Sequence, residues 1–321
     1  MSLRFAGATD AGRRRRRNED SYVVAPPLFA IADGMGGAQA GEVASRLAAG
    51  VLEEAHSDER GETRVAALVQ EANRRVHRRS NEDVATAGMG TTMTVALVDG
   101  TAVAFGHVGD SRAYRVRGGE LEQLTDDHSL VGELVRSGKL SPEDAERHPQ
   151  RSVITRALGT EADVDVDTFT VEAEPDDLFL LCSDGLTDMI SGREILAAVE
   201  DTDDLDRAAR ALVAAANANG GEDNITVILF QVGAGGTSGE TMPMPAVADP
   251  ERPDDEDTLS GLEALPAVDT AVVPATEIER HLSEARAASG EPGLVARFLP
   301  LVALLVALAL IAVLVLWGLA R

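Results

Sequence analysis

The sequence predicts an α+β fold, in which strands and helices occur in separate blocks. Runs of strand-length apolar segments alternate with runs of amphipathic helices, and not every strand is followed by a helix as in a wound parallel sheet. Four short strands between Thr91 and Leu124 are joined by the turns Asp99-Gly100 and Gly118-Gly119, as in an antiparallel meander. The chain has 321 residues, 44% of them hydrophobic, which is enough for a large core.

The first half of the chain supplies three strands and then two helices. Strands are predicted at Ser2–Asp10, Ser21–Val24 and Leu28–Ala32. Amphipathic helices follow at about 41–56 and 62–79, and each has one apolar stripe that is expected to face the core.

The segment that follows the meander, residues 126–160, has a looser pattern of short helical pieces and several basic side chains. An insertion beside a sheet is a usual place for substrate contacts, and we expect that role here. The remaining elements alternate again. Strands are predicted at Asp165–Val171, Asp177–Ser183 and Asn224–Val232, and helices at Gly192–Glu200 and Asp204–Asn217.

The composition changes after Gly233, which divides the chain into residues 1–233, 234–296 and 297–321. The middle segment contains glycines, prolines and the acidic cluster Asp254–Asp257, and it is predicted to be a flexible linker. Phe298–Ala320 is a run of 23 uncharged residues. As a helix it would be about 34 Å long, against a hydrocarbon core of about 30 Å. We therefore expect a C-terminal transmembrane helix.

Charge and cysteine content exclude several classes of protein. The 54 acidic and 29 basic side chains give a net charge of -25, which opposes nucleic-acid binding. The single cysteine, Cys182, rules out an internal disulfide and a zinc site built from several cysteines, and is interpreted as a small core residue. The arginine run 13–17 is not followed by an apolar export signal. The expected location is a single-pass anchor in the cell membrane with the N-terminal domain in the cytoplasm.

Carboxylates recur where apolar strands meet turns. If these strand ends converge, the carboxylates would repel one another unless cations lay between them. The pattern therefore predicts a site for hard divalent cations, which prefer oxygen ligands. The positions are Glu19-Asp20, Asp33-Gly34, Asp110-Ser111, Asp184-Gly185 and Asp223-Asn224.

Seven motifs, in this order, resemble those of the metal-dependent serine/threonine protein phosphatases of the 2C type. The similarity covers about Leu3–Val232 and is greatest to the bacterial branch, which pairs with membrane-anchored serine/threonine kinases. The motifs are TDAGRRRRRNEDS (9–21), ADGMGG (32–37), GTT (90–92), VGDSRAY (108–114), HPQRSVITRALG (148–159), CSDGL (182–186) and EDNITV (222–227).

The resemblance implies a four-layer αββα sandwich with a binuclear Mn²⁺ or Mg²⁺ centre at one edge. Asp33 would bridge both cations, and Gly34 would offer its carbonyl oxygen. Asp184 and Asp223 would hold one cation, and Glu19 would hold the other, directly or through water.

Three further residues receive roles from the same resemblance. Asp20 would orient bound water, Asp110 together with Asp184 would hold a third and weaker cation, and Arg15 would bind the substrate phosphate. Arg15, Asp33 and Asp184 are therefore the predicted catalytic residues. Arginine suits phosphate because its planar guanidinium makes paired, charge-assisted hydrogen bonds.

Two positions depart from the family pattern. Met35 stands where many eukaryotic relatives carry a histidine proposed as the general acid, and methionine cannot donate a proton. His107, His128 and His148 are interpreted as structural, so the general acid stays unassigned. The run Arg13–Arg17 is either a solvated hairpin turn or a patch that recruits acidic phosphopeptides or anionic lipid headgroups.

The leading hypothesis is a membrane-anchored enzyme that hydrolyses phosphoserine and phosphothreonine in proteins and opposes serine/threonine kinases at the inner face of the membrane. Expected partners are phosphorylated proteins, including membrane-anchored kinases, and lipid around residues 298–320; the chain is expected to be a monomer. A catalytically silent phosphoprotein-binding module is disfavoured because every metal carboxylate is present. A hydrolase of small phosphate esters would need stacking groups in a closed pocket, and only 3% of residues are aromatic.

Overall fold

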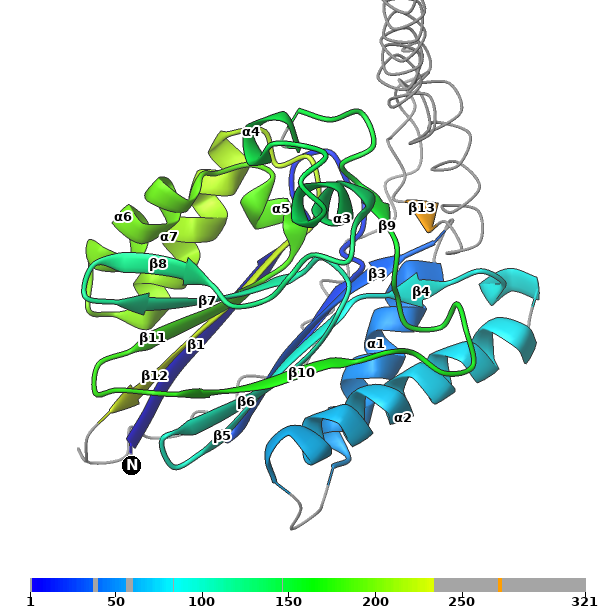
Figure 1. Ribbon diagram of the computed structural model, residues 1–321, viewed down its shortest axis with the longest axis horizontal. Coiled ribbons are helices and arrows are strands. Elements are labelled where there is room, and N and C mark those ends of the chain that lie inside the picture. The colour runs from blue at the N-terminus through cyan, green and yellow to red at the C-terminus, as the bar shows by residue number, and fades with distance from the viewer. Residues whose placement is uncertain are drawn as a thin grey trace, which may run out of the picture. The chain divides into compact units, whose positions relative to one another are not determined.

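Two antiparallel sheets stand face to face in the described part of the chain (Figure 1). The computed structural model describes residues 2–36, 40–55, 60–82, 84–145, 147–233 and 271–272. In sheet order, the first sheet contains β1 (Ser2–Asp10), β12 (Ile225–Gly233), β11 (Leu178–Cys182), β7 (Arg112–Arg117) and β8 (Glu120–Gln123). The second contains β10 (Asp167–Glu172), β6 (Ala102–Val108), β5 (Met93–Asp99), β3 (Leu28–Met35) and β2 (Asp20–Ala25), and β4 (Gly90–Thr91) pairs with β3.

Helices cover the outer face of each sheet. The apolar stripes of α1 (Ala40–Glu53) and α2 (Gly61–Glu82) pack on the second sheet, and η1 (Val84–Thr86) follows α2. On the first sheet lie α6 (Gly192–Glu200), α7 (Leu205–Ala218) and the short α5 (Asp184–Thr187). Figure 1 shows the two helix layers on opposite sides of the paired sheets.

Aromatic side chains fill the space between the sheets. The rings of Phe29 in β3 and Phe230 in β12 are stacked with their centroids 4.5 Å apart, and Phe179 of β11 stacks on Phe230 at 5.0 Å. All three side chains are fully buried. Such stacked pairs stabilise a core beyond the area that they bury. The predicted α+β fold with two antiparallel sheets is confirmed.

The predicted end of the strand that leads to Asp33 was wrong. Asp33 and Gly34 were expected in a turn after the strand, but β3 continues through them to Met35. The reason is a pairing with β4, in which Gly34 lies opposite Thr91 and Met35 lies opposite Gly90. Asp33 therefore belongs to a strand and has a fixed backbone. Asp184, likewise predicted in a turn, is the first residue of α5.

The segment 126–160 contains α3 (Leu130–Arg136), α4 (Pro142–Ala145) and β9 (Val153–Ile154), as expected for an insertion of short elements. A two-residue strand, β13 (Ala271–Val272), pairs in parallel with β9. Apart from β13, the predicted linker 234–296 and the predicted transmembrane helix 297–321 lie outside the described residues. Within the described ranges, every helix is too short or too polar to cross a membrane.

Candidate metal centre and phosphate-binding loop

Five aspartates from separate elements interact electrostatically at one end of the two sheets. Asp20 and Asp33 lie opposite each other in the β2–β3 ladder. Asp184 begins α5, Asp110 follows β6, and Asp223 precedes β12. Burial, and then the charges of the other four aspartates, hold the pKa of Asp33 well above its usual range. The predicted convergence of these carboxylates is therefore present in the structure.

Several oxygens of this cluster lack a hydrogen-bond partner. Among the described residues, Asp20 Oδ1, Asp110 Oδ1 and Asp184 Oδ1 are buried and accept no hydrogen bond. Burial is the main cause that raises the pKa of Asp20 to about 6 and that of Asp110 to about 7. A buried polar atom without a partner costs about 1–3 kcal/mol, and more when it is charged. Divalent cations would supply the missing partners, so this donor set fits them.

The cluster does not form a cage of protein ligands alone. In the described ranges, no group of three or more His, Cys, Asp or Glu side chains is arranged to hold a metal ion by itself. Mg²⁺ keeps several of its waters and takes only one or two carboxylates from a protein. Carboxylates that do not form a complete cage, with water as the remaining ligands, therefore suit this type of ion.

Asp20 is anchored through one oxygen only. Its Oδ2 accepts hydrogen bonds from Ser183 Oγ at 2.9 Å and from Thr226 Oγ1 at 2.6 Å. Ser183 and Thr226 are fully buried. The carboxylate is thus oriented by Thr226 of β12 and by Ser183, which directly follows β11, and its Oδ1 is left for water or a cation.

Asp33 is fixed through its backbone. The Asp33 amide donates to Thr92 Oγ1 at 3.0 Å, and the Asp33 carbonyl accepts from Thr91 Oγ1 at 2.8 Å and from the Thr92 amide at 2.9 Å. Thr92 Oγ1 also lies 2.8 Å from Ser111 Oγ. Because Ser111 follows Asp110, these hydroxyls connect the backbones that carry Asp33 and Asp110.

Gly34 occupies a position where no side chain fits. A Cβ atom there would lie 2.2 Å from the Gly41 carbonyl oxygen and 2.5 Å from that of Glu19. A Cβ on Gly41 would lie 2.3 Å from Glu19 Oε2. The Glu19 carboxylate therefore lies against a side-chain-free stretch of backbone next to Asp33, which only glycine allows.

Arg15 lies beside this cluster in the loop of residues 11–19, which we call the arginine loop. Its Nη2 atom is 2.7 Å from Asp223 Oδ2, and the side chains are 28% and 31% exposed. Burial lowers the pKa of Arg15, but Asp223, Glu19 and Asp33 together more than offset this and the net pKa is raised. Arg15 thus stays charged and reachable from solvent, as a phosphate ligand must.

Three of the other arginines of the run bind the loop to the rest of the protein. Arg13 Nε donates to the Asn217 carbonyl at 2.7 Å. Arg14 pairs with Glu222 at 3.2 Å, and Arg17 with Glu42 at 3.8 Å. These contacts favour the interpretation of the run as a hairpin held on the surface.

The sequence interpretation missed Asp188. It lies one helical turn after Asp184, and burial raises its pKa, with Asp223 and Asp127 adding to the effect. Asp188 Oδ2 is 3.5 Å from Arg151 Nε of the insertion. The spacing of four residues could have revealed it, but that inference requires a helix, and the segment was interpreted as a turn.

The three histidines occupy different environments. His107 and His128 are buried, and their rings lie 4.7 Å apart. His107 bonds to Thr94 and the Asp126 carbonyl, and His128 bonds to Gly109 and Asp167. His148 is half-buried and accepts from the Gln150 amide. These contacts support structural roles for His107 and His128.

Taken together, the fold and the site define a two-sheet protein with a buried aspartate cluster that fits divalent cations, beside an arginine suited to phosphate. The sequence model of the family described as protein phosphatase 2C matches residues 12–235. The chain therefore belongs to the protein phosphatase 2C family.

Individual relatives agree with this assignment. The chain is 42% identical over 235 residues to "Serine/threonine phosphatase stp" of Listeria monocytogenes, a match that covers 70% of this chain and 93% of that protein. The crystal structure of Mycobacterium tuberculosis PstP/Ppp superposes with a TM-score of 0.70 at 38% identity, over 73% of this chain and all of that one. The catalytic domain of PstP in complex with two manganese ions gives a TM-score of 0.67 at 39% identity, over 72% and 99%.

Proposed function

We propose that this chain is a metal-dependent protein serine/threonine phosphatase that uses Mn²⁺ or Mg²⁺. The observation that carries the proposal is the buried aspartate cluster with unpaired oxygens beside an accessible Arg15. The names of the relatives and the two manganese ions of the PstP complex support the same reaction and the same kind of cofactor.

The residues that would hold two cations are those predicted from the motifs. Asp33 would contact both, with the Gly34 carbonyl and the carboxylates of Glu19, Asp184 and Asp223 around them. Bound divalent cations lower the pKa of a water ligand to near neutrality and neutralise the charge of a phosphate group. Asp20, which accepts hydrogen bonds from Ser183 and Thr226, would orient water at this centre. Asp110 would be a ligand of a third cation.

Arg15 would orient the phosphate. In the structure its guanidinium is paired with Asp223, and a phosphate oxygen could share the remaining N–H donors without breaking that pair. The pairing also keeps the guanidinium close to the cations' carboxylates. Arg15 is thus expected to act mainly in binding the phosphate group of the substrate.

A cysteine nucleophile is excluded. Cys182, the only cysteine in the sequence, is fully buried in β11, and burial raises its pKa to about 12. The reactive form of cysteine is the thiolate, which is negligible at neutral pH when the pKa is this high. Hydrolysis by an activated water, without a phosphocysteine intermediate, is the reaction that remains consistent with this site.

Met35 does not supply the proton that the leaving alkoxide needs. Its side chain is 5% exposed and packs with Ile154 and Ala157 of the insertion. Position 35 therefore joins the insertion to the end of β3. The proton would come from water or from a group that the substrate brings near the centre.

We further propose that residues 297–321 anchor the enzyme in the cell membrane, with the catalytic domain as a monomer on the cytoplasmic face. The uncharged run Phe298–Ala320 supports this. The linker would allow the domain to reach phosphorylated membrane kinases and other substrates nearby. Membrane fractionation with protease protection tests it: release of the full chain by high salt alone would contradict an anchor.

The activity is tested with the purified full chain in mild detergent and a phosphothreonine peptide. Phosphate release should require Mn²⁺ or Mg²⁺, stop with a chelator, and be lost in Asp184→Asn. Release that continues with chelator would refute the metal-dependent mechanism. Tight peptide binding without turnover would favour the phosphoprotein-binding alternative, and faster hydrolysis of nucleotides than of peptides would favour the small-ester alternative.

A further inference from the structure

Asn224 contacts the arginine loop at three separated points. Its Nδ2 atom donates to the Ala11 carbonyl at 3.0 Å and to the Arg17 carbonyl at 2.8 Å, and its Oδ1 accepts from the Glu19 amide at 2.8 Å. The residue is 4% exposed. One buried side chain thus holds the first residue of the loop, its last residue, and one in between.

Asn224 is itself held among the metal-site residues. It directly follows Asp223, whose Oδ1 accepts from the Asn224 amide at 2.8 Å. Its carbonyl oxygen accepts from Ser183 Oγ at 3.3 Å. A Cβ on Gly185 would lie 2.0 Å from that oxygen, so the backbone after Asp184 is pressed against it. The Asn224 backbone is therefore fixed relative to Asp184 and Asp223.

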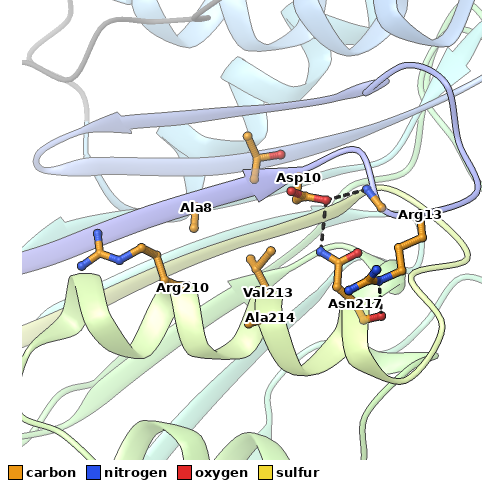
Figure 2. A pocket seen from close by; sticks show the side chains of 9 residues that line it. Ala8, Asp10, Arg13, Arg210, Val213, Ala214 and Asn217 are labelled. Atoms are coloured by element: carbon orange, nitrogen blue, oxygen red, sulfur yellow. Dashed lines mark hydrogen bonds between the residues drawn. The ribbon is translucent and has the colours of Figure 1, made fainter.

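The loop is also fastened near its beginning by contacts that do not involve Asn224. Figure 2 shows the groove of about 580 Å³ between β1 and α7, where Asp10 accepts from the Gly12 amide at 2.8 Å and from Asn217 Nδ2 at 3.1 Å. Arg13 reaches the Asn217 carbonyl in the same view. These bonds hold residues 12 and 13, whereas Asn224 holds 11, 17 and 19.

We propose that Asn224 is the positioning residue that presets the arginine loop, so that Arg15 and Glu19 face the aspartate cluster before substrate arrives. This inference rests on the proposed function, because it assigns the residue that orients two groups of that site. Glu19 is one of the residues that Asn224 binds, and Arg15 lies in the loop between two others, Ala11 and Arg17. Asp223, which pairs with Arg15, directly precedes Asn224.

The chemistry of the side chain explains why asparagine stands here. The site presents two carbonyl oxygens and one amide N–H, and a primary amide offers two donors and an acceptor in one plane. An aspartate would set a charge against two carbonyl oxygens, and alanine would remove the partner of all three backbone groups. Outer residues that orient ligands in this way typically change metal affinity or activity 10- to 100-fold when replaced.

The test uses the full chain, with Asn224→Ala and Asn224→Asp as variants and Asn219→Ala as the matched control. Asn219 is exposed, and its amide bonds only within the last turn of α7. Asn224→Ala should raise the inhibition constant of inorganic phosphate and the KM for a phosphothreonine peptide about tenfold. The Mn²⁺ concentration for half-maximal activity should rise as well, because the Glu19 amide also loses its acceptor. Asn219→Ala should leave all three unchanged.

A double-mutant cycle with Arg15→Ala tests whether Asn224 acts through Arg15. In the Arg15→Ala background, Asn224→Ala should not weaken phosphate inhibition further, but it should still raise the Mn²⁺ requirement. Equal fold-changes in phosphate inhibition in both backgrounds would overturn the inference. So would unchanged phosphate inhibition in Asn224→Ala.

Hydrogen exchange gives a readout that does not depend on activity. The amides of residues 15–19 should exchange faster in Asn224→Ala, and those of residues 15–18 in Asn224→Asp, which keeps an acceptor for the Glu19 amide. Unchanged exchange in a folded variant would refute the role of Asn224, even if the protein were not a phosphatase. If Asn224→Ala does not fold, Asn224→Asp alone decides by the same measurement.

Discussion

Two hydrogen bonds join His128 to Gly109. The Gly109 amide donates to His128 Nδ1 at 3.0 Å, and the His128 amide donates to the Gly109 carbonyl at 2.8 Å. Since Nδ1 accepts, the neutral ring carries its proton on Nε2, which lies 3.1 Å from Asp167 Oδ2. Gly109 precedes Asp110, and His128 precedes the N-cap of α3. The contact joins the Asp110 turn to the insertion.

Replacing His128 by alanine is expected to raise the Mn²⁺ requirement of the activity about tenfold, because the peptide before Asp110 loses its side-chain support. His128→Asn places an acceptor close to the Nδ1 position and should retain most of the wild-type response. Mn²⁺ titrations of both variants and the wild type measure this. Identical titrations of the Ala and Asn variants would show that the Gly109 contact does not matter.

Asp184→Asn is expected to abolish turnover and to stabilise the metal-free fold. The substitution removes one charge from a buried cluster in which burial, and then the neighbouring aspartates, raise the pKa of Asp33 and that of Asp184. We expect a gain on the order of 1 kcal/mol in the free energy of unfolding at pH 8 with chelator. Urea unfolding measures it, with the exposed Asp163→Asn as the control that should change nothing. A destabilised Asp184→Asn would contradict the repulsive cluster.

Removing the cations should destabilise the fold more at pH 7.5 than at pH 5.5. In the metal-free protein, burial raises the pKa of Asp20 to about 6 and that of Asp110 to about 7. These carboxyls bind more protons in the folded than in the unfolded chain, so the metal-free fold loses stability as the pH rises from about 4 to about 7. Cations that neutralise the carboxylates cancel this loss.

The measurement is the difference in unfolding free energy between Mn²⁺ and chelator at the two pH values. The difference should grow by roughly 3 kcal/mol from pH 5.5 to 7.5. Histidines that titrate in this range affect both samples alike and drop out of the comparison. A difference independent of pH would mean that protons and cations do not compete for these carboxylates.

His107 is expected to destabilise the fold at acidic pH. Burial and the neighbouring His128 lower the pKa of His107 to about 3, from about 6.5 when unfolded. The folded chain therefore binds fewer protons than the unfolded chain, and stability falls as the pH drops below about 6.5. At pH 5 this amounts to about 2 kcal/mol relative to pH 8.

The check is the unfolding free energy of the wild type minus that of His107→Gln, at pH 5 and pH 8. Glutamine keeps a donor for the Asp126 carbonyl, to which His107 Nε2 lies 3.1 Å away. Whatever the difference in unfolding free energy is at pH 8, at pH 5 it should have shifted by about 2 kcal/mol in favour of the variant. A constant difference would mean that His107 titrates normally in the folded protein.

Local signals were sufficient for most of the elements. The boundaries of α6 were predicted without error, and Ser191 and Glu194 form a capping box at its start, which is a signal contained within four residues. Asp204 caps α7 in a similar way. Strands whose ends coincide with glycine or aspartate turns were also placed within two or three residues, because turn chemistry is local.

Nonlocal pairing explains the errors. The last residues of β3 pair with β4 more than fifty positions later, so nothing near Asp33 could indicate that the strand continues. Asp188 became part of the site only because α5 forms against β12 and α7. The sequence assigned no role to Asn224, because its three partners in the arginine loop lie more than two hundred positions earlier.

The sequence by itself determined which carboxylates are available, at which strand ends they stand, and which family motifs surround them. Only the tertiary structure decided that these groups converge, that Asp20 is anchored through one oxygen, and that Arg15 pairs with Asp223. The physical reason is range. Periodicity, capping and turn preferences act over a few residues, whereas a cluster of like charges is held together by packed strands that are distant in sequence, and its spacing is not encoded in any one of them.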